Sequence, residues 1–232
     1  MSTSYSYVDV NYCNKKGIIV TNVPKYSTDS VTEYACFLMM AIARKLPMQI
    51  KNNFKEEFTE KYLQTQIKNA KVGIIGLGSI GKRLAEILKG LGLDILYWSR
   101  NSRDNRFKYN ELEDIFKSAD FIFPTFAINE ETKKIISEEL INSMKKSASI
   151  ISIVGTDCLN KELIINKVKN NELYGFAFES AEDSLNNYDG NIMITAPYAW
   201  YTEEALENCI EIWVQSIEGV ATGKIVNSVN NN

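Results

Sequence analysis

The chain has 232 residues, of which 45% are hydrophobic and 24% are charged, and its formal net charge is -3. This size and balance predict one large soluble domain, or one domain with an appendage, that buries a substantial core. The slight negative charge argues against nucleic-acid binding, because nucleic acids are bound by basic surfaces. The longest apolar run, Tyr34 to Ala43, is shorter than the roughly 20 residues of a membrane span.

The residue types also limit the cellular location and the chemistry that we expect. The N-terminal residues MSTSYSYVDV lack the basic start and apolar run of a signal peptide, so we expect a cytoplasmic protein. The four cysteines are scattered without a CxxC pair, which predicts packing residues in a reducing compartment and no metal site. The chain has no histidine, so the commonest general acid/base and the commonest metal ligand are both missing.

The first 70 residues are predicted to precede the main domain. Residues 18–21 are expected to form a short strand, and Ser30-x-x-Glu33 is expected to cap a helix from Val31 to Leu46 that ends at Pro47. This helix is apolar around most of its circumference, which predicts a partner surface; a wholly internal helix is the alternative. Residues 51–69 are a charged connector, and its spaced Phe54 and Phe58 suggest an amphipathic arm.

The most informative segment is KVGIIGLGSIG at residues 71–81. A strand at 72–75 leads into Gly76-x-Gly78-x-x-Gly81, and an amphipathic helix follows to about residue 89. Gly76 permits a tight turn, Gly78 admits a pyrophosphate close to the backbone, and Gly81 lets helix and strand pack closely. The helix start supplies free N–H groups for phosphates. A second strand at 93–98 completes the order required of a dinucleotide-binding βαβ unit. The alternative is a glycine-rich turn whose domain has lost its ligand.

Alternation of strands and helices continues to the end of the chain. Strands are expected at 120–124, 149–153, 174–178 and 192–195, and helices at 137–145 and 160–170. Asn110-x-x-Glu113 predicts a capping box for a short helix ending near residue 117. The last helix is predicted from Thr202 to about residue 221, with Gly223 as its stop. The expected fold is α/β, a Rossmann doubly wound parallel sheet with helices on both faces and the order 3-2-1-4-5-6.

From Val8 to Val226 the chain resembles the D-isomer-specific 2-hydroxyacid dehydrogenases, of the glyoxylate/hydroxypyruvate reductase type. The segments GIIVTNVPKYSTDSVTEYA, KVGIIGLGSIGKRLA, ETKKIIS and AWYTEEA carry this resemblance. It implies an N-terminal strand, helix and arm over 1–68, an NAD(P)-binding domain over 69–200, and a C-terminal helix over 201–232. That helix would return toward a substrate lobe that is otherwise largely absent from the chain. The resemblance also implies a homodimer through the Val31–Leu46 helix.

The resemblance implies cofactor contacts residue by residue. They fall on the pyrophosphate turn, the end of the second strand, the loop after the third strand, the passage beside the nicotinamide ribose, and an acidic position that bonds the carboxamide. The implied residues are Gly76, Gly78, Ser79, Ile80, Gly81, Ser99, Arg100, Asn101, Thr125, Phe126, Ala127, Thr132, Ile153, Val154, Gly155 and Glu179.

The end of the second strand bears on the choice of nicotinamide nucleotide. A carboxylate at this place would bind the ribose hydroxyls of NAD, but here Ser99 occupies it, with Arg100 beside it and Arg103 nearby. A hydroxyl and a guanidinium can bind and neutralise a 2′-phosphate. Similar Ser-Arg pairs occur in NADP-using members of the family. NADP is therefore favoured and NAD is possible; the alternative is a solvated surface arginine.

The resemblance also defines a catalytic set that we do not find. The family reduces 2-keto acids with an arginine, a glutamate and a histidine, and the corresponding positions here are Gly155, Ser184 and Pro197. The last arginine of the chain is Arg106, so no small shift of alignment restores the set. Glu182 or Asp183 could replace the glutamate, but it would have no histidine to orient.

Three functions are weighed. The first is a nicotinamide-dinucleotide-binding member of the family in which 2-keto acid reduction is weak or absent. The second is an active NADP-dependent reductase of altered substrate that uses Tyr198 or Glu179. The third is a non-enzymatic dimer that senses the dinucleotide.

Overall fold

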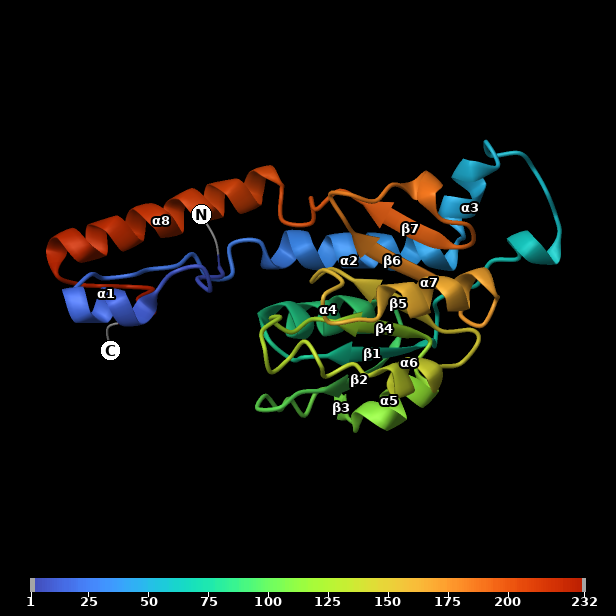
Figure 1. Ribbon diagram of the computed structural model, residues 1–232, viewed down its shortest axis with the longest axis horizontal. Coiled ribbons are helices and arrows are strands. Elements are labelled where there is room, and N and C mark those ends of the chain that lie inside the picture. The colour runs from blue at the N-terminus through green and yellow to red at the C-terminus, as the bar shows by residue number, and fades with distance from the viewer. Residues whose placement is uncertain (1–2, 231–232) are drawn as a thin grey trace. The chain divides into compact units, whose positions relative to one another are not determined.

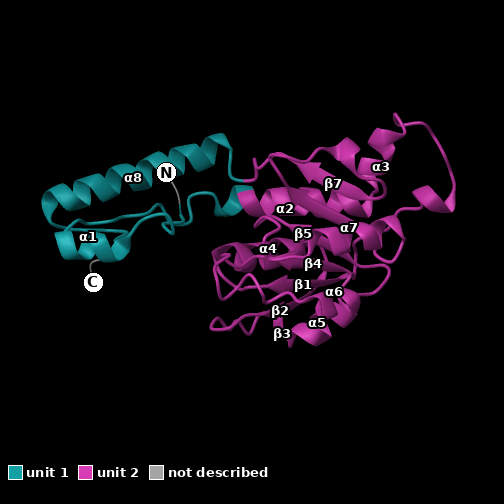
Figure 2. Cartoon of the chain, in the orientation of Figure 1, with its two compact units in different colours: residues 1–30, 200–232 teal, residues 31–199 magenta. Residues whose placement is uncertain are grey.

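The computed structural model describes residues 3–230, which divide into two compact units (Figure 2). Residues up to Ser30 and residues from Trp200 onward form the smaller unit, and Val31–Ala199 form the larger one. Within residues 3–230, no helix is both long enough and apolar enough to cross a membrane. The domain boundaries inferred from the sequence remain a prediction.

The larger unit is built on a seven-stranded, wholly parallel sheet (Figure 1). Its order is β3-β2-β1-β4-β5-β6-β7. The strands are β1 (Lys71–Ile75), β2 (Asp94–Trp98), β3 (Lys108–Tyr109), β4 (Phe121–Pro124), β5 (Ser149–Ser152), β6 (Gly175–Glu179) and β7 (Ile192–Thr195). The central strands are apolar and buried on both faces, as expected of a parallel sheet covered by helices. The predicted Rossmann fold is confirmed.

Two apolar layers enclose the sheet. Helices α2 (Thr28–Ala43) and α4 (Ser79–Gly90) pack on one face. Helices α5 (Leu112–Ser118), α6 (Glu138–Asn142) and α7 (Lys161–Lys169) pack on the other. Two strand glycines permit this close packing. A Cβ on Gly73 would lie 2.2 Å from the Ile115 side chain, and one on Gly175 would lie 2.6 Å from that of Ile42.

The short strand β3 was not anticipated. It pairs with β2 through two residues only and occupies the third position in the order. The order 3-2-1-4-5-6 holds only when β3 is counted; for the six strands that the sequence predicted it is wrong, because β3 occupies the place beside β2 that the third predicted strand would take. The strand expected at 120–124 is consequently the fourth, and it lies beside β1. Two residues carry too little periodic pattern to reveal a strand.

The prediction for the N-terminal helix was wrong at both ends. Helix α2 begins at Thr28, so Ser30 lies inside it and cannot cap it. It ends at Ala43, because Lys45 adopts a left-handed φ of 49°. A separate helix α3 (Leu46–Lys51) follows, with Pro47 in its first turn, where the missing N–H of proline has no cost.

The starts of the other helices had mixed outcomes. The capping box at Asn110 is wrong, since Glu111 occupies the N-cap of α5 and makes no side-chain cap. Ser137 and Asn160 do cap α6 and α7 through their side chains. Thr202 caps α8 (Glu203–Thr222), and Gly223 ends it with a φ of 73°.

The predicted arm has little regular structure after α3. Its one regular element beyond Lys51 is the 3₁₀ turn η1 (Glu60–Tyr62). Phe54 and Phe58 are 66% and 93% exposed, so their rings have no packing partner of the kind that an amphipathic helix would provide.

The smaller unit pairs the two ends of the described chain. It contains α8 and a helix that the sequence did not reveal, α1 (Val10–Lys16), which Asp9 caps. The strand expected at 18–21 is reduced to one antiparallel bridge, Thr21 to Ser228. Asn230 accepts from the Val20 N–H and donates to the Ile18 carbonyl.

Candidate dinucleotide site

The candidate residues follow the carboxyl ends of β1, β2, β4, β5 and β6. Because these strands are parallel and adjacent, their carboxyl ends lie along one edge of the sheet, which we call the nucleotide edge. Ligands of open α/β sheets bind outside this edge, where the strand order reverses. Here the reversal falls between β1 and β4, and the glycine turn follows β1.

The glycine turn has the geometry expected of a phosphate cradle. Gly76 has a φ of 105°, which favours glycine. A Cβ on Gly81 would lie 2.1 Å from the Gly76 carbonyl oxygen, so only glycine fits there. Nothing lies within 4 Å of a Cβ built on Gly78, and this residue is the N-cap of α4 without a side-chain cap. The open side of the turn therefore presents the helix start, including Ser79 and Ile80, to an incoming anion.

Thr125 holds the turn from the neighbouring strand. Its hydroxyl donates to the Gly76 carbonyl at 2.6 Å and its N–H donates to the Ile75 carbonyl at 2.8 Å. Phe126 lies against Gly76, with its backbone nitrogen 3.0 Å from the position of a Cβ there. Thr125 is thus buried as a support of the turn, a role that the sequence did not reveal.

The loop after β4 is closed by Thr132. Its hydroxyl donates to the Ala127 carbonyl at 2.7 Å and accepts from the Asn129 N–H at 2.8 Å. Thr132 is only 3% exposed. This side chain therefore shapes the loop from within.

The loop after β2 carries the three residues expected to select the nucleotide. The Ser99 hydroxyl accepts from the Ser102 N–H at 3.3 Å. Arg103 donates to the Ser99 carbonyl at 2.7 Å and lies over the Tyr109 ring. Arg100 forms an ion pair with Glu131 at 2.9 Å, which joins this loop to the loop after β4. Asn101, between these residues, is exposed. The partner Glu131 was missed because nothing in the sequence connects two loops 31 residues apart.

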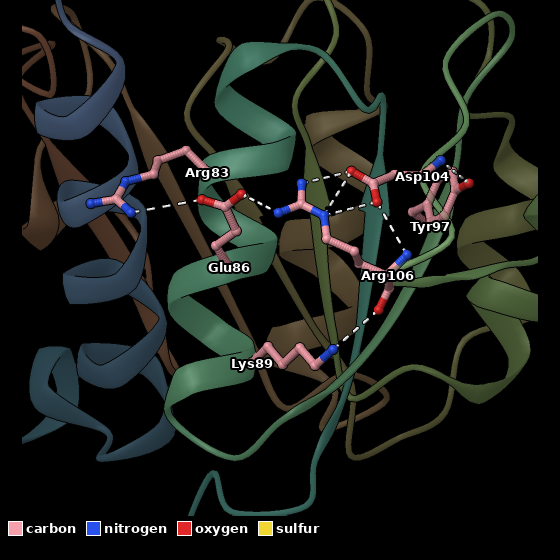
Figure 3. Close-up of polar contacts among 6 residues, drawn as sticks. All are labelled: Arg83, Glu86, Lys89, Tyr97, Asp104 and Arg106. Carbon is pink, nitrogen blue, oxygen red and sulfur yellow. Dashed lines mark hydrogen bonds and ion pairs between the residues drawn. The ribbon is translucent and has the colours of Figure 1, made fainter.

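A polar network ties the same loop to α4 (Figure 3). Arg106 forms a two-pronged contact with Asp104 and reaches Glu86 of α4 at 2.7 Å. Asp104 donates its N–H to the Tyr97 hydroxyl, and Lys89 donates to the Arg106 carbonyl. Hydrogen bonds from Arg106 lower the pKa of Asp104 to about 2. Arg106 is therefore engaged in holding the loop.

The loop after β5 turns at Gly155, whose φ is 86°. The Ser152 hydroxyl donates to the Gly155 carbonyl at 2.6 Å, which fixes the passage through Ile153 and Val154. Gly155 is the position that the resemblance would match to the family's arginine, and its left-handed backbone favours glycine there.

Glu179 ends β6 with a half-buried carboxylate. One of its oxygens accepts from the Ala199 N–H at 2.9 Å. Burial raises the pKa of Glu179, and backbone hydrogen bonds from Ala199 and Tyr198 partly offset this. Thr195, its register partner on β7, has a buried hydroxyl oxygen without a hydrogen-bond partner among the described residues. Thr195 was not singled out from the sequence, although its place at the end of a strand could have indicated it.

The Asp183 carboxylate accepts hydrogen bonds that fix the loop after β6. It accepts from Ser180, Tyr188 and Lys161, at 2.9, 2.6 and 3.0 Å. These hydrogen bonds lower the pKa of Asp183.

The other two predicted positions lie nearby in the chain. The Ser184 hydroxyl donates to the Asn187 side-chain oxygen at 2.8 Å, and Pro197 is exposed after β7. In residues 3–230, His, Cys, Asp and Glu side chains do not gather into groups of three that could hold a metal.

The sheet is parallel and has this strand order, and a glycine turn joins β1 to α4, whose N-terminus has no side-chain cap. These features define a dinucleotide-binding protein of the Rossmann class. The particular family follows from comparison with known proteins. The chain belongs to the D-isomer specific 2-hydroxyacid dehydrogenases, whose NAD-binding domain model matches residues 36–196.

Characterised relatives extend the match beyond that domain. The chain is 26% identical to an aromatic 2-oxoacid reductase of Clostridium sporogenes, over 91% of this chain and 71% of the relative. It is also 26% identical to a glyoxylate reductase of Pyrococcus furiosus, over 97% of this chain and 72% of the relative.

Solved structures agree with the fold. An acyclic imino acid reductase in complex with NADPH and D-Arg aligns with a TM-score of 0.89 at 25% identity, covering 98% of this chain and 76% of that one. The D-lactate dehydrogenase of Aquifex aeolicus, complexed with NAD and lactic acid, aligns with a TM-score of 0.86 at 24% identity, covering 100% and 79%.

Proposed function

We propose that this protein binds a nicotinamide dinucleotide at the nucleotide edge, with NADP(H) preferred over NAD(H), and reduces 2-keto acids weakly or not at all. The observation that carries the binding is the glycine turn. The space beside Gly78 is free for a phosphate, and Gly81 packs so closely against the Gly76 carbonyl that no side chain fits there. The preference for NADP(H) is supported by Ser99 at the end of β2 and by Arg100 and Arg103 on the same loop, because a guanidinium stabilises a 2′-phosphate.

The weak reduction is supported by the residues at the family's catalytic positions. Gly155, Ser184 and Pro197 carry no group that could clamp a carboxylate or protonate a carbonyl oxygen. A positioned proton donor is typically worth about 10² to 10⁴ in rate, and one stabiliser of developing charge about 3 to 4 kcal/mol. Asp183, the nearest substitute carboxylate, is already bound to Ser180, Lys161 and Tyr188.

Titration calorimetry tests the binding proposal. We expect NADPH to bind more tightly than NADH, and Gly78→Asp to abolish binding of both. The substitution places a carboxylate where phosphates would lie, yet its Cβ meets nothing within 4 Å, so the fold should persist by circular dichroism. Equal affinities would refute the preference, and unchanged binding by the folded variant would refute the site.

A second candidate is a reductase of altered substrate that uses Glu179 or Tyr198. The observation in its favour is the half-buried Glu179 carboxyl with its raised pKa, since a raised pKa favours the protonated form of a carboxyl that could donate a proton. The similarity to an imino acid reductase suggests imines beside 2-keto acids as trial substrates. NADPH oxidation that Glu179→Gln abolishes would favour this candidate over the first.

We also propose a homodimer through α2. An apolar groove of about 560 Å³ lies along α2 and α4, lined by Phe37, Met40 and Leu91 among others. These three side chains are 44%, 38% and 41% exposed, although the buried side of α2 is already filled. An exposed apolar groove on a helix is typical of an association surface.

A further inference from the structure

The larger unit contains a second cavity, on the side of the sheet opposite to the nucleotide edge. It has a volume of about 1210 Å³ and is bordered by Ser147, Tyr174 and Asn191, which lie one or two residues before β5, β6 and β7. Small-molecule sites usually have volumes of about 300–1,000 Å³, so the cavity is large enough for a ligand. Helix α3 and the turn η1 supply its other walls. We call it the lysine cavity.

The lysine cavity has an excess of positive charge. Five lysines line it, and only two carboxylates, Glu60 and Asp189, accompany them, which leaves three positive charges unbalanced. The lysines come from four separate segments: Lys45 directly precedes α3 and Lys51 is its last residue, and the others are Lys61, Lys146 and Lys169. Such convergence contrasts with the net charge of -3 for the whole chain.

The contacts of the cavity lysines are to carbonyl oxygens and aromatic rings. Lys133, Lys145, Lys161 and Lys167 all pair with carboxylates within 4 Å. Among the described residues, none of the five cavity lysines does so. Lys45 donates to the Lys61 carbonyl at 2.7 Å and lies over the Tyr174 ring, and Lys51 donates to the Tyr188 carbonyl. Lys169 lies over the Tyr188 ring.

Lys45 and Lys51 are partly buried, whereas Lys61, Lys146 and Lys169 are exposed. Burial lowers the pKa of both Lys45 and Lys51, and for Lys51 the nearby Asp189 offsets the effect only in part. Ammonium groups that lose water without gaining a negative partner are destabilised. A bound anion would supply that partner through charge-assisted hydrogen bonds.

We infer that the lysine cavity is a binding site for a small polyanion that carries two or more phosphate or carboxylate groups, separate from the dinucleotide site. Several lysines around one space suit several negative groups, because each ammonium acts as a point charge with rotatable donors. Binding there would draw together α3, η1 and the starts of β5 and β6.

The test must separate this cavity from the glycine turn, which also attracts phosphates. Tripolyphosphate and, separately, citrate are titrated calorimetrically at low salt into Gly78→Asp protein, in which the turn is blocked. We expect one site per chain for at least one of the two anions. Removing two charges with Lys146→Gln/Lys169→Gln should weaken it at least about tenfold, since each charge-assisted hydrogen bond contributes substantially.

The matched control is Lys68→Gln/Lys117→Gln, which removes two exposed lysines that do not line the cavity. It should keep the affinity within about twofold. The inference is overturned if neither anion binds at millimolar concentration, if both double variants lose affinity equally, or if neither does. Dinucleotide binding is measured separately on the unsubstituted protein, so failure of one proposal is distinguishable from failure of the other.

Discussion

Arg100 contacts the Glu131 carboxylate, and we propose that it also binds the 2′-phosphate of NADP(H). The two negative groups would compete for the same guanidinium. The observed ion pair is exposed on both sides, with side chains 47% and 77% accessible, and such pairs contribute little in water. A doubly charged phosphate can therefore displace Glu131. In this interpretation Glu131 holds the arginine in place before the nucleotide arrives.

Removal of that competition gives a first prediction. Glu131→Gln should tighten NADPH binding between about 1.5- and 5-fold, the range expected from a surface ion pair, and leave NADH binding unchanged. Calorimetry with both nucleotides measures this. The control is Glu130→Gln, which removes a negative charge from the adjacent residue, where it pairs with Lys133 and not with Arg100. An equal gain for NADH, or an equal effect of the control, would contradict the role of Arg100.

Glu179 gives a prediction about pH. Its pKa is raised in the folded protein, so the ionised carboxyl costs stability, and this cost is absent below the pKa of the unfolded chain and grows as pH rises through the folded pKa. Glu179→Gln keeps a carbonyl acceptor for the Ala199 N–H. We expect the variant to be more stable than the unsubstituted protein at pH 7, and the difference to shrink toward pH 4.

Thermal unfolding across that pH range measures the difference. Glu182→Gln is the matched control, because Glu182 is exposed on the neighbouring loop and should show no such trend. A difference that is constant with pH would mean that the Glu179 charge has no role in stability.

At the scale of elements, the loop between β2 and β3, residues 99–107, contains no helix or strand. Its shape depends on side-chain contacts to α4, chiefly Arg106 with Glu86 and Asp104. The expected site residues Ser99 to Asn101 lie on this loop, so we expect the network to help position them.

Loss of the network should loosen the loop. Arg106→Ala is expected to speed amide hydrogen exchange over residues 99–107 and to weaken NADPH binding about two- to fivefold. Arg83→Ala is the control, since it removes an arginine of α4 that pairs with Glu86 but leaves the Arg106–Asp104 contact intact. Faster exchange that spreads over the whole sheet would instead indicate global destabilisation.

The helix predicted at Val31–Leu46 shows how local patterns mislead about boundaries. The apolar pattern continues through residues 44–51, but Lys45 is left-handed and divides it into α2 and α3. Lys45 is held there by its bond to the Lys61 carbonyl, 16 residues away. Such a contact depends on tertiary structure, and no periodicity of the sequence could indicate it.

At the scale of the whole molecule, the exposed groove along α2 bears on association. If two copies meet there, Phe37→Glu should convert a dimer to a monomer in sedimentation velocity, because a carboxylate would have to be buried without a partner. Tyr7→Glu, at an aromatic residue that is 75% exposed, should leave the dimer intact. A monomeric unsubstituted protein would refute the proposed interface.

The sequence by itself determined the parallel sheet, the glycine turn after β1, and the placement of most candidate site residues at strand ends. These features depend on local signals, such as apolar runs, the spacing of Gly76, Gly78 and Gly81, and the polar residues Ser137, Asn160 and Thr202 near which helix starts were placed. Only the tertiary structure decided that Glu131 pairs with Arg100, that Thr125 holds the turn, and that five lysines from distant segments share one cavity. These contacts join residues far apart in the chain, and the packing of the folded layers brings them together.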